Sequence, residues 1–77
     1  MNREPTYHHL LESNAALNIA RQRGCFCRVS AGGRVLVFYT GDELNAGTWM
    51  EIGRTGMTDN GFISRNAFEL ITATREP

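Results

Sequence analysis

Residues 60–71 read NGFISRNAFELI, and the way this stretch folds decides the architecture of the chain. Asn60 and Gly61 predict a turn, and the FIS after them predicts a short strand. RNAF is compatible with a single 3₁₀ turn, and ELITAT (69–74) predicts a further strand before the C-terminal tail. A turn, a strand, a tight turn and a strand are what the last third of a small β-barrel contains.

Upstream of this stretch the pattern predicts one helix, over about residues 6–22. Thr6 is a suitable N-cap, and Gly24 is a suitable stop. Between them the apolar residues that recur at helical spacings are Leu10, Leu11, Ala15, Leu17, Ile19 and Ala20. This broad apolar stripe should lie against the rest of the chain or against a neighbour.

From Cys25 onward the apolar period changes to two, which predicts strands. Residues 25–30 and 34–40 flank the turn AGG and predict a hairpin, and TWMEIGR (48–54) predicts a third strand. With 62–64 and 69–74 the chain has five short antiparallel strands, which normally close into a barrel because closure removes exposed edges.

The expected fold is therefore α+β, mainly β. One N-terminal helix precedes a five-stranded antiparallel small barrel over about residues 25–73, and a frayed tail follows at 74–77. No linker or repeat interrupts the sequence, so we expect a single domain over residues 1–77.

The charge of the chain is balanced, with eight arginines and eight acidic residues among 77 residues. A net charge of zero lacks the broad basic field of a nucleic-acid coat protein, so any such role must depend on local patches. Residues 1–40 hold five arginines and two glutamates, whereas 41–77 hold three arginines and six acidic residues. Opposite charge at the two ends suits head-to-tail subunit contacts, and so short a chain has a marginal core. We therefore expect a homo-oligomer.

The two cysteines indicate in which kind of cellular compartment the protein is found. Cys25 and Cys27 are too few for a disulfide framework and too close in sequence to bridge easily, which suits a reducing, cytoplasmic setting. No segment approaches the roughly 20 apolar residues that span a bilayer, and the N-terminus lacks the apolar run of a signal peptide. We expect a cytoplasmic protein with no membrane partner.

Catalytic and metal-binding patterns are weak in this sequence. The soft ligands Cys25, Cys27, His8 and His9 point in different directions from a strand and a helix start, so we expect no metal. Those histidines stand too near the N-terminus to act as the base of a nucleophile, and the glycines form no phosphate-cradling pattern. The sequence therefore predicts a non-enzymatic protein without a cofactor.

Three features remain as possible binding devices. They are Arg65 with Asn66 before the last predicted strand, the aromatic residues Phe38, Tyr39 and Trp49, and the loop from Asp42 to Gly47. Aromatic side chains with nearby arginines can stack on bases and hold phosphates. Trp49 is the strongest of these aromatic candidates for a binding site. Alternation along its strand places it on the face opposite to Met50 and Ile52, which are expected to face the core.

These features carry a family resemblance that covers about residues 17–73. The order of helix, tight glycine hairpin and five strands resembles the Sm-like (Hfq-like) small barrel. In that family a basic residue, His, Ala and an aliphatic residue close the second half. In RNAFELI, Arg65 and Ala67 match the basic residue and Ala, Phe68 and Ile71 match the aliphatic positions, and Asn66 replaces the His. The resemblance implies a ring that binds single-stranded RNA through Arg65, Asn66, Asn45 and Tyr39.

The C-terminal half also resembles SH3 and bacterial SH3 domains. In these a Trp opens a strand, as Trp49 does here, and a 3₁₀ turn with Asn, here Asn66, precedes the final strand. This alternative implies a protein- or peptide-interaction module whose surface contains Trp49, Tyr39, Asp42 and Glu43. A third possibility is a small enzyme made of several barrels, with its site on the symmetry axis.

Overall fold

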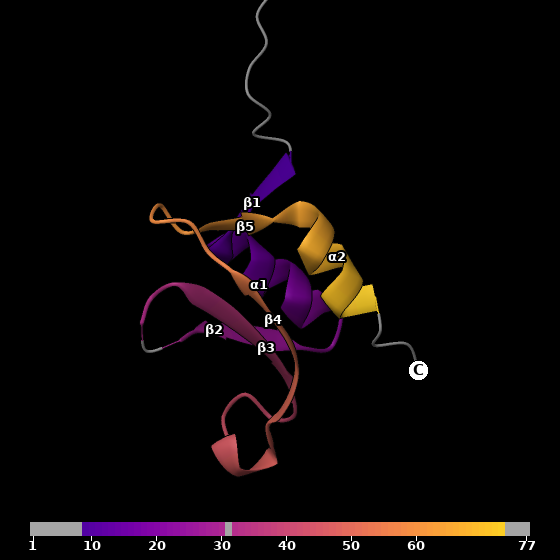
Figure 1. Cartoon of the computed structure of the whole chain (residues 1–77). Helices are drawn as coiled ribbons and strands as arrows, with labels where there is room; N and C mark the ends of the chain where they lie inside the picture. The colour runs from indigo at the N-terminus through magenta and orange to yellow at the C-terminus, as the bar shows by residue number, and fades with distance from the viewer. Residues whose placement is uncertain (1–8, 31, 74–77) are drawn as a thin grey trace, which may run out of the picture.

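The computed structural model describes residues 9–30 and 32–73, in which two small sheets and two helices alternate along the chain (Figure 1). The elements of the first half are β1 (Leu10–Glu12), α1 (Ser13–Gln22), β2 (Phe26–Val29) and β3 (Val35–Thr40). Those of the second half are the 3₁₀ turn η2 (Ala46–Thr48), β4 (Met50–Gly56), β5 (Phe62–Ser64) and α2 (Arg65–Ala73).

The strands form two separate antiparallel sheets. β1 pairs with β5 in register Leu11 to Ile63, and β2, β3 and β4 form a sheet in that order. The hairpin predicted after Gly24 is present, with Cys27 opposite Phe38. A register shift between Phe38 and Tyr39 then displaces the pairing of β3 with β4. Neither sheet closes on itself, so the predicted five-stranded barrel is wrong.

The fifth predicted strand is a helix. α2 begins directly after Ser64, whose Oγ accepts a hydrogen bond from the Ala67 backbone N–H at 3.1 Å and so caps the helix. Phe68 and Thr72 are buried and Ile71 is half-buried, whereas Glu69 and Leu70 are exposed, which is a helical and not an alternating pattern. Cap and helical burial together outweigh the strand preference of the β-branched residues in ELITAT.

The predicted helix over 6–22 is also wrong in its first half. Leu10–Glu12 is extended and pairs with β5, and the Ser13 backbone N–H donates to the Gly61 carbonyl at 2.9 Å. The helix starts only at Ser13, and residues 6–8 lie outside the described residues. Pairing with a strand about fifty residues later overrides the local helical spacing.

One main core cluster holds both sheets and both helices together. Its members are Leu11, Ala16, Ala20, Cys25, Cys27, Leu36, Phe38, Ile63 and Phe68. Phe38 of β3 and Phe68 of α2 are fully buried, with ring centroids 5.8 Å apart. At Gly53 a Cβ atom would lie 3.0 Å from the Ile71 side chain, so glycine lets α2 approach the sheet closely.

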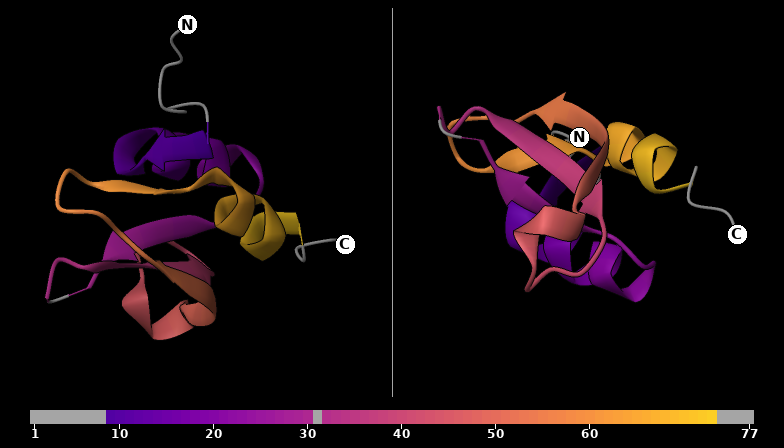
Figure 2. Two further views of the ribbon diagram at one scale, coloured as in Figure 1. Left: turned by 45° about the horizontal axis from the view of Figure 1, so that its top comes forward. Right: turned by 90° about the horizontal axis from the view of Figure 1, so that it is seen from below.

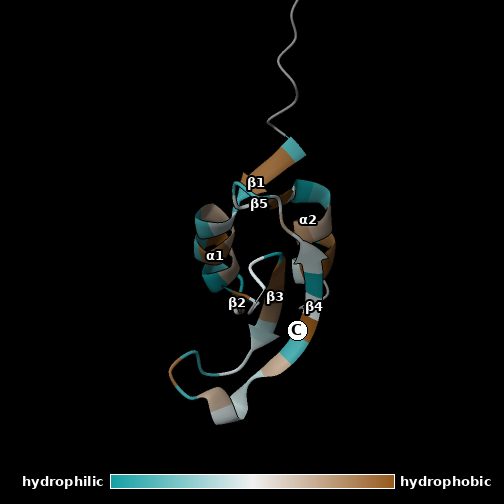
Figure 3. Cartoon of the chain, turned by 60° about the vertical axis from the view of Figure 1, so that its left-hand side comes forward, coloured by the Kyte–Doolittle hydropathy of each residue, from teal (hydrophilic) through white to brown (hydrophobic). Residues whose placement is uncertain are grey.

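The opposite face of the three-stranded sheet carries a second apolar layer. Phe26 and Val37 are 2% and 5% exposed, yet they lie outside the main core cluster. In the ladder Phe26 stands opposite Tyr39, and Val37 stands between Arg28 and Arg54, so these side chains share one face. On this face the Phe26 ring packs against the rings of Tyr39 and Trp49. The two ends of the molecule also differ, since β1, β5 and the start of α2 lie opposite the η2 loop (Figures 1 and 3).

Candidate interaction sites at the two ends of the molecule

The loop between β3 and β4, residues 41–49, is held by short-range hydrogen bonds. The Asp42 carbonyl accepts the Trp49 indole N–H at 2.7 Å, and Asp42 Oδ1 accepts the Leu44 backbone N–H at 3.0 Å. Asn45 Oδ1 accepts the Gly47 backbone N–H at 3.2 Å. The polar residues that the sequence offers as ligand contacts thus build the loop itself, which gives it a defined shape.

Gly41 fixes where this loop leaves β3. Its φ is +119°, and an added Cβ would lie 2.4 Å from the Thr48 carbonyl oxygen. Both facts exclude a side chain at this position. The loop therefore returns tightly on itself and projects from the sheet (Figure 2).

Trp49 lies on the outer sheet face as part of an aromatic cluster. Its ring centroid is 5.1 Å from that of Phe26 and 5.2 Å from that of Tyr39. The Arg28 guanidinium carbon lies 5.1 Å from the Trp49 ring centroid. Trp49 and Tyr39 are half-buried, so this cluster is a surface feature with an apolar base.

An open groove of about 390 Å³ lies between this cluster, α1 and β2. We call it the loop groove, and its lining residues are Leu17, Cys27, Arg28, Val29, Glu43 and Trp49. Arg21 of α1 donates through Nε to Glu43 Oε1 at 3.0 Å and through Nη2 to Glu43 Oε2, which connects the helix to the loop. These hydrogen bonds hold the pKa of Glu43 below its ordinary value.

Cys27 supplies no reactive thiolate to this groove. Burial raises the pKa of its thiol to about 12, and the neighbouring Cys25 adds to the shift. The thiol therefore stays protonated at neutral pH. Across the described ranges no group of three or more His, Cys, Asp or Glu side chains is placed to hold a metal ion. Neither helix of residues 9–73 is long and apolar enough to cross a membrane.

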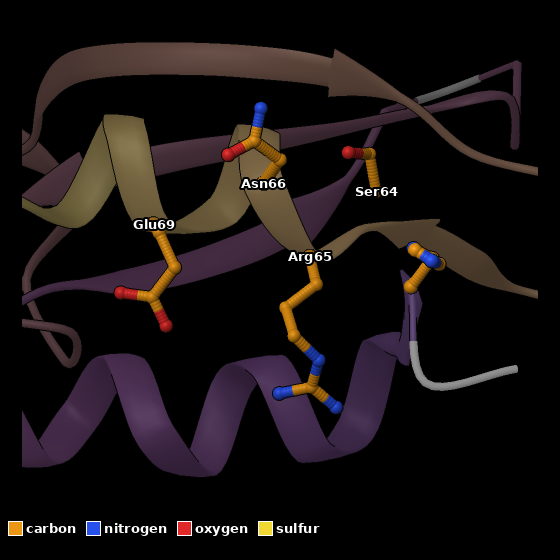
Figure 4. A pocket seen from close by; sticks show the side chains of 5 residues that line it. Ser64, Arg65, Asn66 and Glu69 are labelled. Atoms are coloured by element: carbon orange, nitrogen blue, oxygen red, sulfur yellow. The ribbon is translucent and has the colours of Figure 1, made fainter. Parts of the chain in front are cut away.

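A second hollow, of about 350 Å³, lies at the start of α2 and contains the other predicted site (Figure 4). We call it the α2 hollow, and its lining residues are His9, Ser64, Arg65, Asn66 and Glu69. Arg65 Nη2 lies 3.4 Å from the Leu10 carbonyl oxygen, to which it donates. Figure 4 shows Arg65 and Glu69 extending to one side of the helix and Asn66 to the other.

The structure separates the residues predicted to bind RNA. Arg65 and Asn66 line the α2 hollow, whereas Tyr39 lies near the end of β3 and Asn45 in the loop that follows it. The small barrel from which the ring was expected also needs a fifth strand over residues 69–74, and residues 69–73 are helical. By contrast, the residues of the alternative surface, Trp49, Tyr39, Asp42 and Glu43, all lie in or beside the loop and its aromatic cluster.

The sequence interpretation missed four groove residues: Leu17, Cys27, Arg28 and Val29. The sequence did contain a signal for Arg28, because alternation along 25–30 places its side chain on the sheet face opposite to that of Cys27.

The chain matches no protein-family model, and comparison with curated proteins and with solved structures likewise gives no match.

Proposed function

We propose that this protein is a non-catalytic interaction module that holds a segment of a partner polypeptide in the loop groove. One observation carries the proposal: an open 390 Å³ groove combines Trp49 and Arg28 with the half-exposed Val29. Tryptophan and arginine are the side chains that most often dominate binding energy at protein interfaces. The loop positions Trp49 without needing a ligand, because its shape depends on its own hydrogen bonds, whereas Arg28 projects from β2.

Exposed apolar side chains lie in the wall of the groove and beside the groove. Val29 is 51% exposed, Met50 is 67% exposed and Leu44 is 95% exposed, and all three lie in or next to the loop and β2. Single exposed apolar residues are ordinary, but a group of them beside an aromatic groove marks an interaction site. The structure therefore favours a polypeptide partner over a small polar ligand.

The charges of the groove select the kind of segment that fits. Glu43 lies between two arginines, since Arg21 bonds to it and the charge of Arg28 also lowers its pKa. Arg28 is the cation of the groove lining and Glu43 its anion, and because Glu43 is already bonded to Arg21, Arg28 is left to attract an acidic group. A segment with an acidic residue next to an apolar one matches both the charge and the apolar walls.

A peptide selection would test this function. A displayed library of random 12-residue peptides is selected on the whole protein, and the best peptide is titrated into ¹⁵N-labelled protein. We expect chemical-shift changes at Cys27–Val29, Glu43 and the Trp49 indole. Replacement Arg28→Glu should weaken binding by about tenfold or more, since it exchanges the cation of the groove lining for an anion. The matched control Arg34→Glu, on the exposed hairpin turn, should bind as the wild type does. Shifts confined to the α2 hollow would overturn the proposal.

Single-stranded RNA binding is a second proposal, now restricted to the α2 hollow. It is supported by the hollow's combination of Arg65, Asn66 and His9. Short uridine-rich and adenine-rich RNAs would be titrated at two salt concentrations, with fluorescence anisotropy as the readout. Salt-dependent binding that Arg65→Gln weakens, with Arg75→Gln as control, would support it. No binding by either RNA at micromolar protein would reject it.

We also propose that the protein acts in the cytoplasm. Cys25 and Cys27 are buried and are not joined in a disulfide, which fits a reducing compartment.

A further inference from the structure

Leu44 is the most exposed large apolar side chain among the described residues, at 95%. It lies in a loop whose hydrogen bonds involve its own backbone N–H, so the side chain is presented on a fixed base. Glu43, its direct neighbour, already lines the loop groove. An apolar projection and an apolar groove are therefore adjacent on one surface, and the projection does not fill the groove of its own chain.

The projection has the chemistry that the groove selects. Asp42, Glu43 and Leu44 place acidic residues next to an apolar one, and Glu43 is already paired with Arg21. The Asp42 carboxylate is therefore the negative charge next to Leu44 that can interact with a partner. The groove offers Arg28 at its Trp49 wall and the apolar side chains of Leu17 and Val29. Its 390 Å³ volume has room for a leucine side chain.

We propose that the loop groove binds a second copy of this chain. Leu44 of each copy enters the groove of the other, with Asp42 facing the partner's Arg28. The inference rests on the proposed function, because it uses the same groove. Since projection and groove lie on one surface, a two-fold axis satisfies both contacts at once and the assembly closes as a dimer.

Two equal contacts make the dimer far tighter than either contact alone. Burial of one leucine side chain changes a dissociation constant by about 10- to 100-fold, and the dimer contains two. Self-association also occupies the groove, so dimer formation and peptide binding exclude each other. A groove-binding peptide should therefore shift the protein towards monomers.

Sedimentation equilibrium of the whole chain from about 1 µM to 1 mM tests the inference. We expect a concentration-dependent dimer. Leu44→Asp should raise the dissociation constant by about 100-fold or more, because it places a charge where an apolar contact forms. Val29→Asp, in the groove wall, should have a similar effect. Leu70→Asp is the matched control, since Leu70 is 64% exposed on α2, and it should dimerise as the wild type does.

Mixing the two variants gives the sharpest result. A mixture of Leu44→Asp and Val29→Asp restores one intact contact, between Leu44 of the second variant and the groove of the first. The mixture should associate more tightly than either variant alone. A wild-type chain that is monomeric at 1 mM, a dimer unaffected by Leu44→Asp, or no gain on mixing would overturn the inference. If a selected peptide still binds through Arg28 in that case, the proposed function stands without self-docking.

Discussion

The two ends of this small protein are built in different ways. At the loop end, the side chains of Asp42, Asn45, Thr48 and Trp49 bond to backbone groups no more than seven residues away. At the other end, β1 pairs with β5 and the α2 cap follows directly, so the α2 hollow depends on segments about fifty residues apart. A locally built loop can keep its shape when the rest of the fold is weakened, whereas the α2 hollow cannot.

The largest expected effect comes from removing the anchor of α2. Phe68 is fully buried against Phe38, and Phe68→Ala should destabilise the fold by about 3–5 kcal/mol. Urea unfolding measures the change. The control Leu70→Ala, at an exposed position of the same helix, should change stability by less than about 0.5 kcal/mol. Equal losses for the two variants would mean that α2 does not pack as described.

The next effect should be confined to the loop end. Gly41→Ala forces a side chain into positive φ and against the Thr48 carbonyl, and it should cost about 2 kcal/mol or more. The Trp49 indole N–H donates to the Asp42 carbonyl, so a change in the loop geometry should change the fluorescence of Trp49. Gly47→Ala meets only ordinary contact at 3.4 Å, without a positive φ, and serves as the control. An unchanged Trp49 spectrum in Gly41→Ala would contradict the local construction of the loop.

A smaller effect is expected at the α2 cap. Ser64→Ala removes the acceptor for the Ala67 N–H and should destabilise the protein by about 1 kcal/mol. Ser64→Asp keeps an acceptor and should retain most of the stability. Thermal unfolding compares the three proteins. If Ser64→Asp loses as much stability as Ser64→Ala, capping is not the cause.

The smallest effect concerns the ion pair between α1 and the loop. The pKa of Glu43 is lowered by its hydrogen bonds from Arg21, so its contribution to stability is present above the ordinary glutamate pKa. That contribution is lost as the pH falls through the lowered value. ¹³C NMR titration of the Glu43 carboxyl group in the wild type and in Arg21→Gln tests the cause. The pKa should rise in the variant, and an unchanged value would exclude Arg21.

The sequence interpretation succeeded where structure is local. The hairpin of β2 and β3 follows from period-two alternation and the AGG sequence between the strands, and the two strands are paired as predicted. The surface attributed to Trp49, Tyr39, Asp42 and Glu43 also lies together, because these residues are close in sequence.

It failed where distant segments meet. Leu10–Glu12 has helical spacing by itself and becomes a strand only because β5 is beside it. ELITAT was predicted as a strand because its β-branched residues suit one, although Ser64 was a visible helix cap before it. Leu17 was not predicted as a site residue, because α1 reaches the groove only through tertiary packing, which the local sequence pattern does not reveal.

The most direct test of the proposed docking is an isotope-filtered NMR experiment on a mixture of ¹³C-labelled and unlabelled protein at about 1 mM. Nuclear Overhauser effects selected to join different chains should connect the Leu44 methyl groups of one copy to the Trp49 indole and Val29 methyl groups of the other. If the intermolecular effects join other surfaces instead, or if none is detected, Leu44 does not enter the groove of a second copy.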